Sequence, residues 1–144
     1  MLFRSDGAGI AAALTLGAAA AQLGTAFVAC PESSADPGYR AALLGPPAEH
    51  TVMTAGISGR PARCLANRLT ALTEGALPQA IPDYPIAYDA GKALHTAAKA
   101  VREYGYGAQW AGQGAPLARA LPAAELVACL RSELEKALSD RLTR

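Results

Sequence analysis

Residues 7–30 read GAGIAAALTLGAAAAQLGTAFVAC, and this stretch decides the fold class. Its first half has apolar residues at helical spacing, which predicts a short helix that begins after Asp6 and ends at Gly17. The almost wholly apolar run 19–29 then predicts a strand buried on both faces, as in a parallel sheet. One such strand cannot form a sheet by itself, so its partners must come from a longer chain or from other copies of this one.

Three residues interrupt the apolar run near its end: Gln22, Gly24 and Thr25. Glycine lets a ligand come close to the backbone, and amides that open a following helix favour anions. The pattern therefore indicates a phosphate or cofactor at this strand end. An ordinary strand end would show the same residues, so the spacing alone leaves both interpretations open.

The composition is that of a globular protein, with 144 residues of which 51% are hydrophobic. Thirteen basic residues balance 12 acidic ones, and this argues against a nucleic-acid partner. The three cysteines are widely spaced and form no CxxC motif, so neither a disulfide framework nor a metal site is indicated. We expect buried, reduced thiols in a cytoplasmic protein.

The N-terminus has the outline of a secretory signal, because a weakly basic start precedes an apolar run that ends near Cys30. Asp6 and the glycines of the run count against that interpretation, and a secreted protein with a mature N-terminus near Cys30 is a minor alternative. No run reaches the roughly 18–20 apolar residues of a spanning helix, so we expect no membrane partner.

The remainder of the chain is expected to be mostly helical. Pro and Gly residues mark the ends of the next elements. Between them the sequence predicts a helix over 36–44, a strand over 51–54, a turn over 56–61, a helix over 62–73 and a loop over 75–83. A helix opened by Pro85 carries an apolar stripe of Ile86, Ala90, Ala93, Leu94, Ala97 and Val101. A glycine-rich segment, 104–116, precedes a last helix from Pro122 with the stripe Leu126, Val127, Leu130, Leu134, Ala137 and Leu138.

Five segments, in the same order, resemble the nitronate monooxygenases, once called 2-nitropropane dioxygenases. They are GIAAALTLGAAAAQLGTAFVACPES, RAALLG, SGRPARCLANR, IPDYPIAYDAGKAL and WAGQGAPLARALPAAELV, and they cover nearly the whole chain. The flavin-dependent enoyl-ACP reductases are a more distant resemblance. They share the strand and the GRPAR-like turn but fit DYPIAYDAGK and WAGQG less well.

The resemblance implies an α/β fold, the C-terminal part of an FMN-binding (β/α)8 TIM barrel with an added helical substrate-binding segment. It places residues 9–16 on the seventh barrel helix and 20–28 on the eighth strand. We expect 1–144 to be a single partial domain with three parts: the last barrel helix and strand with the phosphate-site loop (7–30), the added helical segment (31–120) and a helix that packs on the barrel (121–144).

The family's QxGT motif contacts the FMN phosphate, and the matching residues here are Gln22, Leu23, Gly24 and Thr25. In such barrels the phosphate site lies in the loops after strands seven and eight. Trp110, Gln113 and Gly114 are substrate-pocket candidates in a loop that would close over a flavin or line the substrate cavity. A plain packing loop explains these three equally well.

The departures from the family concern the catalytic part. A full barrel takes about 250 residues, and the family's first six strands, flavin-ring contacts and catalytic histidine have no counterpart here. MLFRSD stands where relatives carry a strand that ends in a glycine pair. We therefore expect a truncated chain that contains no catalytic residue.

Other polar residues have simpler interpretations. His50 and His95 match no family motif, and we expect both to be solvated. Arg60 and Arg63 suit an anion, but we expect them to fix the turn. Asp36 is expected to be a helix cap, and the tyrosines are expected to pack rather than to wall a pocket.

The resemblance implies a function: FMN-dependent oxidation of alkyl nitronates by oxygen to a carbonyl compound and nitrite. We expect this chain to be related to such enzymes but to lack their activity. The alternatives are a non-catalytic remnant that self-associates through an exposed strand edge, and a relative of the enoyl-ACP reductases.

Overall fold

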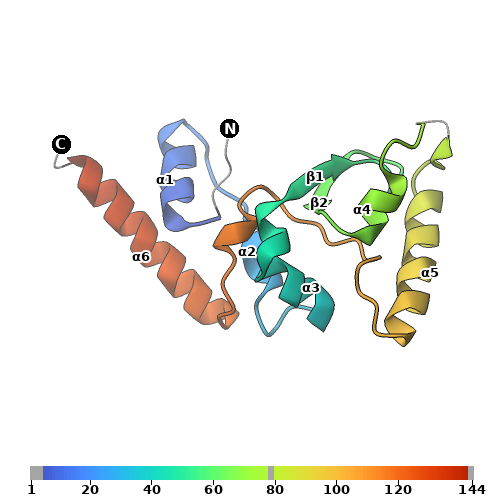
Figure 1. Ribbon diagram of the computed structural model, residues 1–144. Helices are drawn as coiled ribbons and strands as arrows, with labels where there is room; N and C mark the ends of the chain where they lie inside the picture. The colour runs from blue at the N-terminus through green and yellow to red at the C-terminus, as the bar shows by residue number, and fades with distance from the viewer. Residues whose placement is uncertain (1–4, 78–79, 143–144) are drawn as a thin grey trace. The chain divides into compact units, whose positions relative to one another are not determined.

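A computed structural model describes residues 5–77 and 80–142 and divides the chain into two compact units (Figure 1). The first unit comprises residues 1–35 and 113–144, and the second comprises 36–112. The predicted loop over 75–83 includes residues 78–79, which lie outside the described residues.

The first unit begins with α1 (Gly7–Thr15), whose predicted ends are confirmed. Asp6 caps the helix, because its Oδ1 accepts a hydrogen bond of 2.8 Å from the amide of Gly9. Gly17 ends the helical segment with a φ of 93°, a left-handed conformation that favours glycine. The unit continues with α2 (Thr25–Val28), the short 3₁₀ helix η3 (Ala115–Leu117) and α6 (Ala123–Leu142).

The predicted buried strand over 19–29 is wrong for the chain by itself. Residues 18–23 have no regular secondary structure and mostly face solvent, and 25–28 form α2 instead. A parallel strand is stable only when neighbouring strands satisfy its backbone groups on both sides. The described residues supply no such neighbours, so residues 18–23 form no strand.

The core of the first unit joins α2 to α6. Ala26 and Cys30 are buried against Leu126 and Leu130, and partly buried apolar residues surround them, including Leu23 and the cluster members Ile10, Phe27, Leu121 and Ala123. The predicted stripe of the last helix is therefore confirmed at Leu126 and Leu130. Val127 and Leu138 lie outside this core and are 53% and 40% exposed.

The second unit contains α3 (Pro37–Leu43), the 3₁₀ helix η1 (Pro46–Glu49), β1 (Thr51–Thr54), β2 (Ala62–Leu65), α4 (Arg68–Thr73) and α5 (Ile86–Ala100). The two strands pair antiparallel, with Thr51 opposite Leu65 and Thr54 opposite Ala62. Ile57, Cys64 and Leu69 form the buried centre of this unit. The predicted helix over 36–44 and strand over 51–54 are confirmed.

The predicted helix over 62–73 is wrong in its first third. Ala62–Leu65 is a strand because it has a partner on each side: β1 on one and the backbone of Trp110 on the other. The helix starts only after Asn67, whose side chain accepts a hydrogen bond of 3.1 Å from Thr70, while Thr70 Oγ1 accepts one of 2.9 Å from the amide of Asn67. Pairing with a distant segment overrode the local helical pattern.

The helix predicted after Pro85 is confirmed as α5, but its apolar stripe is not buried in the second unit. Ile86, Leu94 and Val101 are 65%, 39% and 77% exposed, and the alanines between them face solvent as well. Ala87 is the buried residue of the helix. The helix packs on its unit through the side that carries Ala87, Tyr88 and His95, and it leaves its apolar stripe uncovered.

Among residues 5–77 and 80–142, no helix has both the length and the apolar character that a bilayer crossing demands.

Candidate functional site

The segment predicted to bind phosphate lies at the start of α2. Gln22 is exposed and Leu23 packs on the core cluster of the first unit. Gly24 is the N-cap residue of α2, and Thr25 is its first residue. Ala26, one residue further on, is fixed in the core against α6. The four motif residues thus lie at an anchored helix start, even though the strand expected before them is absent.

The space in front of Gly24 is open. A Cβ atom built on Gly24 would meet no heavy atom within 4 Å, so a ligand can reach the backbone there. The surrounding groups are hydrogen-bond donors: the Gln22 amide, the Thr25 hydroxyl and the backbone N–H groups that open α2. This donor set fits a phosphate group.

The substrate-pocket candidates fall into both units. Trp110 belongs to the second unit, where it packs on the Ile57–Cys64–Leu69 cluster and its ring lies 6.4 Å from the Tyr88 ring. Gln113 and Gly114 belong to the first unit, where Gln113 is exposed and Gly114 is buried at the start of η3.

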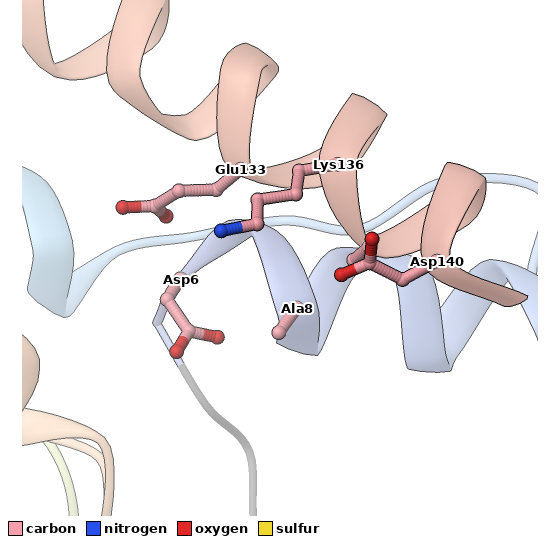
Figure 2. A pocket seen from close by; sticks show the side chains of 6 residues that line it. Asp6, Ala8, Glu133, Lys136 and Asp140 are labelled. Atoms are coloured by element: carbon pink, nitrogen blue, oxygen red, sulfur yellow. The ribbon is translucent and has the colours of Figure 1, made fainter.

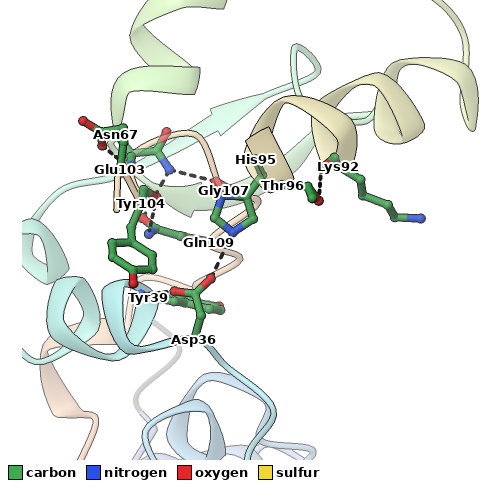
Figure 3. Close-up of polar contacts among 11 residues, drawn as sticks. Asp36, Tyr39, Asn67, Lys92, His95, Thr96, Glu103, Tyr104, Gly107 and Gln109 are labelled. Atoms are coloured by element: carbon green, nitrogen blue, oxygen red, sulfur yellow. Dashed lines mark hydrogen bonds and ion pairs between the residues drawn. The ribbon is translucent and has the colours of Figure 1, made fainter. Parts of the chain in front are cut away.

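The glycine-rich segment around Trp110 is held by a polar network that the sequence did not indicate (Figure 3). Asn67 Nδ2 donates to the Gly107 carbonyl at 2.9 Å and to Gln109 Oε1 at 3.2 Å. Gln109 is buried and donates in turn to the Tyr104 carbonyl at 3.3 Å. Asn67 therefore caps α4 and fixes the loop at the same time.

A second polar contact ties α3 to α5 in the same view (Figure 3). Asp36 accepts a hydrogen bond from the Tyr39 amide at 2.8 Å through Oδ1, as a helix cap, and its Oδ2 lies 2.9 Å from His95 Nε2. The His95 side chain is only 18% exposed, so the prediction that it is solvated is wrong. His50, by contrast, is exposed as predicted. The cap role predicted for Asp36 is confirmed, whereas its contact with His95 was not predicted from the sequence.

Both arginines of the SGRPAR turn have structural partners. Arg63 Nη1 donates to the carbonyl and the hydroxyl of Thr51, at 3.1 and 3.2 Å, across the two-stranded sheet. Arg60 lies over the Tyr84 ring with 5.0 Å between the guanidinium carbon and the ring centroid. The expectation that these residues fix the turn is confirmed.

The first unit also has a shallow pocket of about 240 Å³ between α1 and α6 (Figure 2). Glu133 at its edge accepts hydrogen bonds from the Gly7 amide at 2.8 Å and from Arg119 at 2.5 Å. These two donors, Arg119 foremost, lower the pKa of the Glu133 carboxyl. The charged lining includes Asp6, Lys136 and Asp140, and in the described part of the chain no group of His, Cys, Asp or Glu could hold a metal ion.

The lowered pKa of Glu133 predicts a pH-dependent stability. A carboxyl with a depressed folded pKa stabilises the fold above its unfolded value, near 4.5, and that contribution is lost as the pH falls through the folded pKa. We expect Glu133→Gln to lower the free energy of unfolding by about 1 kcal/mol at pH 7 and to flatten its fall below pH 4.5. Urea denaturation at a series of pH values tests this. Glu135→Gln, in an exposed pair with 3.7 Å between Arg131 and Glu135, is the matched control and should change little.

The sequence profile of the family described as nitronate monooxygenase matches residues 5–133. The chain belongs to the nitronate monooxygenase family. The nitronate monooxygenase of Paraburkholderia phytofirmans strain PsJN is 67% identical to it over 138 residues. That match covers 94% of this chain but 37% of the relative, so the chain spans little more than a third of the curated relative's length.

Two solved structures resemble this nitronate monooxygenase family chain. The nitroalkane oxidase from Streptomyces ansochromogenes has a TM-score of 0.86 and 41% identity, and the match covers 94% of this chain and 38% of the other. FabK from Thermotoga maritima has a TM-score of 0.73 and 28% identity, covering 96% of this chain and 44% of the other. The predicted fold class is confirmed: the chain is part of a (β/α)8 barrel of the α/β class, mostly helical as it stands.

Proposed function

We propose that this chain provides the phosphate-binding part and the added helical segment of an FMN-dependent oxidoreductase that converts an alkyl nitronate and oxygen to a carbonyl compound and nitrite. The observation that carries the proposal is the open backbone at Gly24, at an anchored helix start within the residues that match the nitronate monooxygenase family profile. When bound, the flavin would supply the electron-accepting chemistry.

In this proposal, Gln22, Leu23, Gly24 and Thr25 hold the FMN phosphate. Gly24 allows the close approach, while the Gln22 amide and the Thr25 hydroxyl add donors to the backbone N–H groups of α2. Leu23 contributes by packing on the core and so fixing the backbone next to Gly24. Trp110, Gln113 and Gly114 would line the substrate pocket.

No residue of this chain is proposed to act as the base. His95 is engaged by Asp36, and His50 matches no motif of the family. General-base catalysis requires a group within hydrogen-bond reach of the substrate proton. We place that group in the part of the relatives' length that this chain does not span. The chain alone is then expected to release no nitrite from a nitronate above background.

The test is an FMN titration of the purified chain, followed by flavin fluorescence. Saturable binding that Gly24→Asp abolishes would support the assigned phosphate site, because the new carboxylate repels the phosphate and fills the open space. Ala18→Asp adds the same charge at an exposed neighbouring position and should leave binding unchanged. If a folded chain bound no FMN, or if both variants weakened binding equally, the assignment of these residues as a phosphate site would be rejected for this chain.

A nitrite-release assay addresses the activity separately. Turnover by the isolated chain at the level of a complete nitronate monooxygenase would show that a base lies within residues 1–144 and would overturn the placement of the catalytic group elsewhere. We prefer nitronate oxidation to the enoyl-ACP reductase alternative as the proposed activity. Both the family profile and the 67% identical relative carry the nitronate monooxygenase description. A cytoplasmic location stays a prediction from the cysteine pattern.

A further inference from the structure

Trp110 lies in a segment whose composition gives its backbone little restraint. Residues 105, 107 and 112 are glycines, and glycine has more conformational freedom to lose on folding than any other residue. Trp110 is the single tryptophan of the chain, and its partly exposed ring packs on the apolar centre of the second unit. A ring on such a segment keeps one position only if other residues fix the backbone next to it.

Two tight turns precede the Trp110 side chain. The Gln109 amide donates to the Gly107 carbonyl and the Trp110 amide donates to the Ala108 carbonyl, both at 3.0 Å. Hydrogen bonds between residues two positions apart are those of γ-turns, which bend the chain within three residues. The conformation of residues 107–109 therefore decides the direction in which the Trp110 side chain leaves the backbone.

Asn67 holds the first of these turns at both ends (Figure 3). Its Nδ2 donates to the Gly107 carbonyl at 2.9 Å and to Gln109 Oε1 at 3.2 Å. Both acceptors belong to buried residues, so water has little access to replace a lost donor, and an unpaired buried acceptor is costly. The orientation of the Asn67 amide is fixed as well. Its Oδ1 accepts the Thr70 amide at 3.1 Å, and Nδ2 must then face the segment.

His95 of α5 limits the same turn on its other side. A Cβ atom on Gly107 would lie 2.9 Å from His95 Cε1, so no space separates the ring from the Gly107 backbone. His95 is itself held, because its Nε2 lies 2.9 Å from Asp36 Oδ2. The turn has no room to shift toward α5, and the Asn67 side chain restrains it from the start of α4.

We propose that Asn67 is a positioning residue for the proposed substrate pocket: through the turn at 107–109 it holds the Trp110 ring where that ring lines the pocket. The inference rests on the proposed function, because that function is what assigns Trp110 to a substrate pocket. Tyr39 bonds to the Trp110 carbonyl, which follows the ring in the chain, whereas Asn67 acts on the residues that precede it.

The first test uses the tryptophan fluorescence of the whole chain, which reports on the Trp110 ring alone. Asn67→Ser keeps a good N-cap residue for α4 but is too short to reach the segment. Asn67→Asp keeps the acceptor for the Thr70 amide and loses both donors. We expect both variants to shift the Trp110 emission to longer wavelength and to make quenching by acrylamide about twofold stronger, because the segment opens more often.

Thr70→Val is the matched control. The Thr70 hydroxyl accepts from the Asn67 amide at 2.9 Å and donates to the Asn67 carbonyl at 2.8 Å, so its loss weakens the start of α4 but leaves both Nδ2 bonds. We expect a chain that unfolds at lower urea concentration but has the Trp110 emission of the parent. A folded Asn67→Ser or Asn67→Asp chain with parent-like emission, or an equal change in Thr70→Val, would overturn the proposal.

A nitronate titration separates this proposal from the proposed function. With FMN present, propane-2-nitronate should quench Trp110 saturably in the parent and in Thr70→Val, and should bind about tenfold more weakly to Asn67→Ser. Equal binding by the parent and Asn67→Ser would reject the role of Asn67 and leave the pocket in place.

Two further outcomes concern the parent chain. If the parent binds FMN but its Trp110 does not respond to the nitronate, Trp110 is rejected as a pocket residue, and the positioning role of Asn67 is rejected with it, while the phosphate site stands. If the parent binds no FMN, the phosphate site is rejected for this chain, and the ligand-free spectra still decide whether Asn67 holds the Trp110 ring.

Discussion

Replacing Gly7 with alanine is expected to lower the free energy of unfolding of the first unit by about 1–3 kcal/mol, toward the upper end of that range. Gly7 is buried where α1 meets α6. A Cβ atom built there would lie 2.3 Å from the Cβ of Glu133 and 2.5 Å from the backbone nitrogen of Leu134. Since one of these neighbours is backbone, the clash cannot be relieved by turning a side chain, and the two helices must separate.

The separation would also break a polar contact. The Gly7 amide donates to Glu133 Oε2 at 2.8 Å, and a displaced α1 loses this bond at the same time as its packing. Denaturation followed by circular dichroism measures the loss, and hydrogen exchange should show it first in α1. The matched control is Gly91→Ala, because the nearest atom to its added Cβ is the Ile57 carbonyl oxygen at 3.5 Å, an ordinary contact. In the interior of α5 that change should stabilise by about 0.5–1 kcal/mol. Equal destabilisation by both variants would contradict the role given to Gly7.

Removal of the Tyr39 hydroxyl should destabilise the second unit by about 1–3 kcal/mol at neutral pH. The hydroxyl donates to the backbone carbonyl of Trp110, which connects α3 to the glycine-rich segment. Tyr39→Phe keeps the ring but leaves that carbonyl without its donor. Thermal or urea unfolding of the variant measures the difference from the parent chain.

The same residue predicts an effect at alkaline pH. Burial, followed by the neighbouring Cys64 and Asp36, raises the pKa of Tyr39 from 10.0 to about 12. When the pKa of an acid is higher in the folded than in the unfolded state, its neutral form stabilises the fold. This contribution is complete at pH values below the unfolded-state pKa and is lost as the pH rises through the folded-state pKa. The parent chain should therefore lose more stability between pH 10 and 12 than Tyr39→Phe does. A difference absorbance titration of the two proteins should show one phenol that ionises near pH 12. Ionisation of this phenol near pH 10 would contradict the buried hydrogen bond.

Local signals in the sequence were reliable predictors of where helices start and stop. Asp6 and Asp36 accept hydrogen bonds from amides three residues later, and Gly17 takes the left-handed conformation expected after a helix. Each of these features depends on a few consecutive residues. The sequence therefore contains all the information that they need.

The wrong predictions all concern partners far away in the chain or outside it. Ala62–Leu65 looks helical by itself, and the pairing of Cys64 with Trp110 makes it a strand. The contact between Asp36 and His95 joins residues 59 positions apart, and no local pattern indicates it. The stripe of α5 has the period of a core helix, but periodicity does not specify which molecule covers the stripe.

Residues 22–25, the proposed phosphate site, also combine features that the local sequence predicts with features that it does not. The residues alone favoured an ordinary strand end over an anion site, and only the resemblance favoured the anion site. The structure adds that the backbone in front of Gly24 is accessible and that α2 is anchored. The sequence does not predict that α2 begins at this segment although the expected strand over 19–29 is absent.

The anchoring of α2 by α6 has a consequence for synthesis on the ribosome. Ala26 and Cys30 are made about 100 residues before Leu126 and Leu130, the residues that bury them. The contact between Gly7 and Glu133 spans 126 positions. The second unit, whose contacts lie within 36–112, is complete before either of these can form. During translation the contacts of α1 and α2 with α6 therefore form only after α6 has been made, later than the contacts within the second unit.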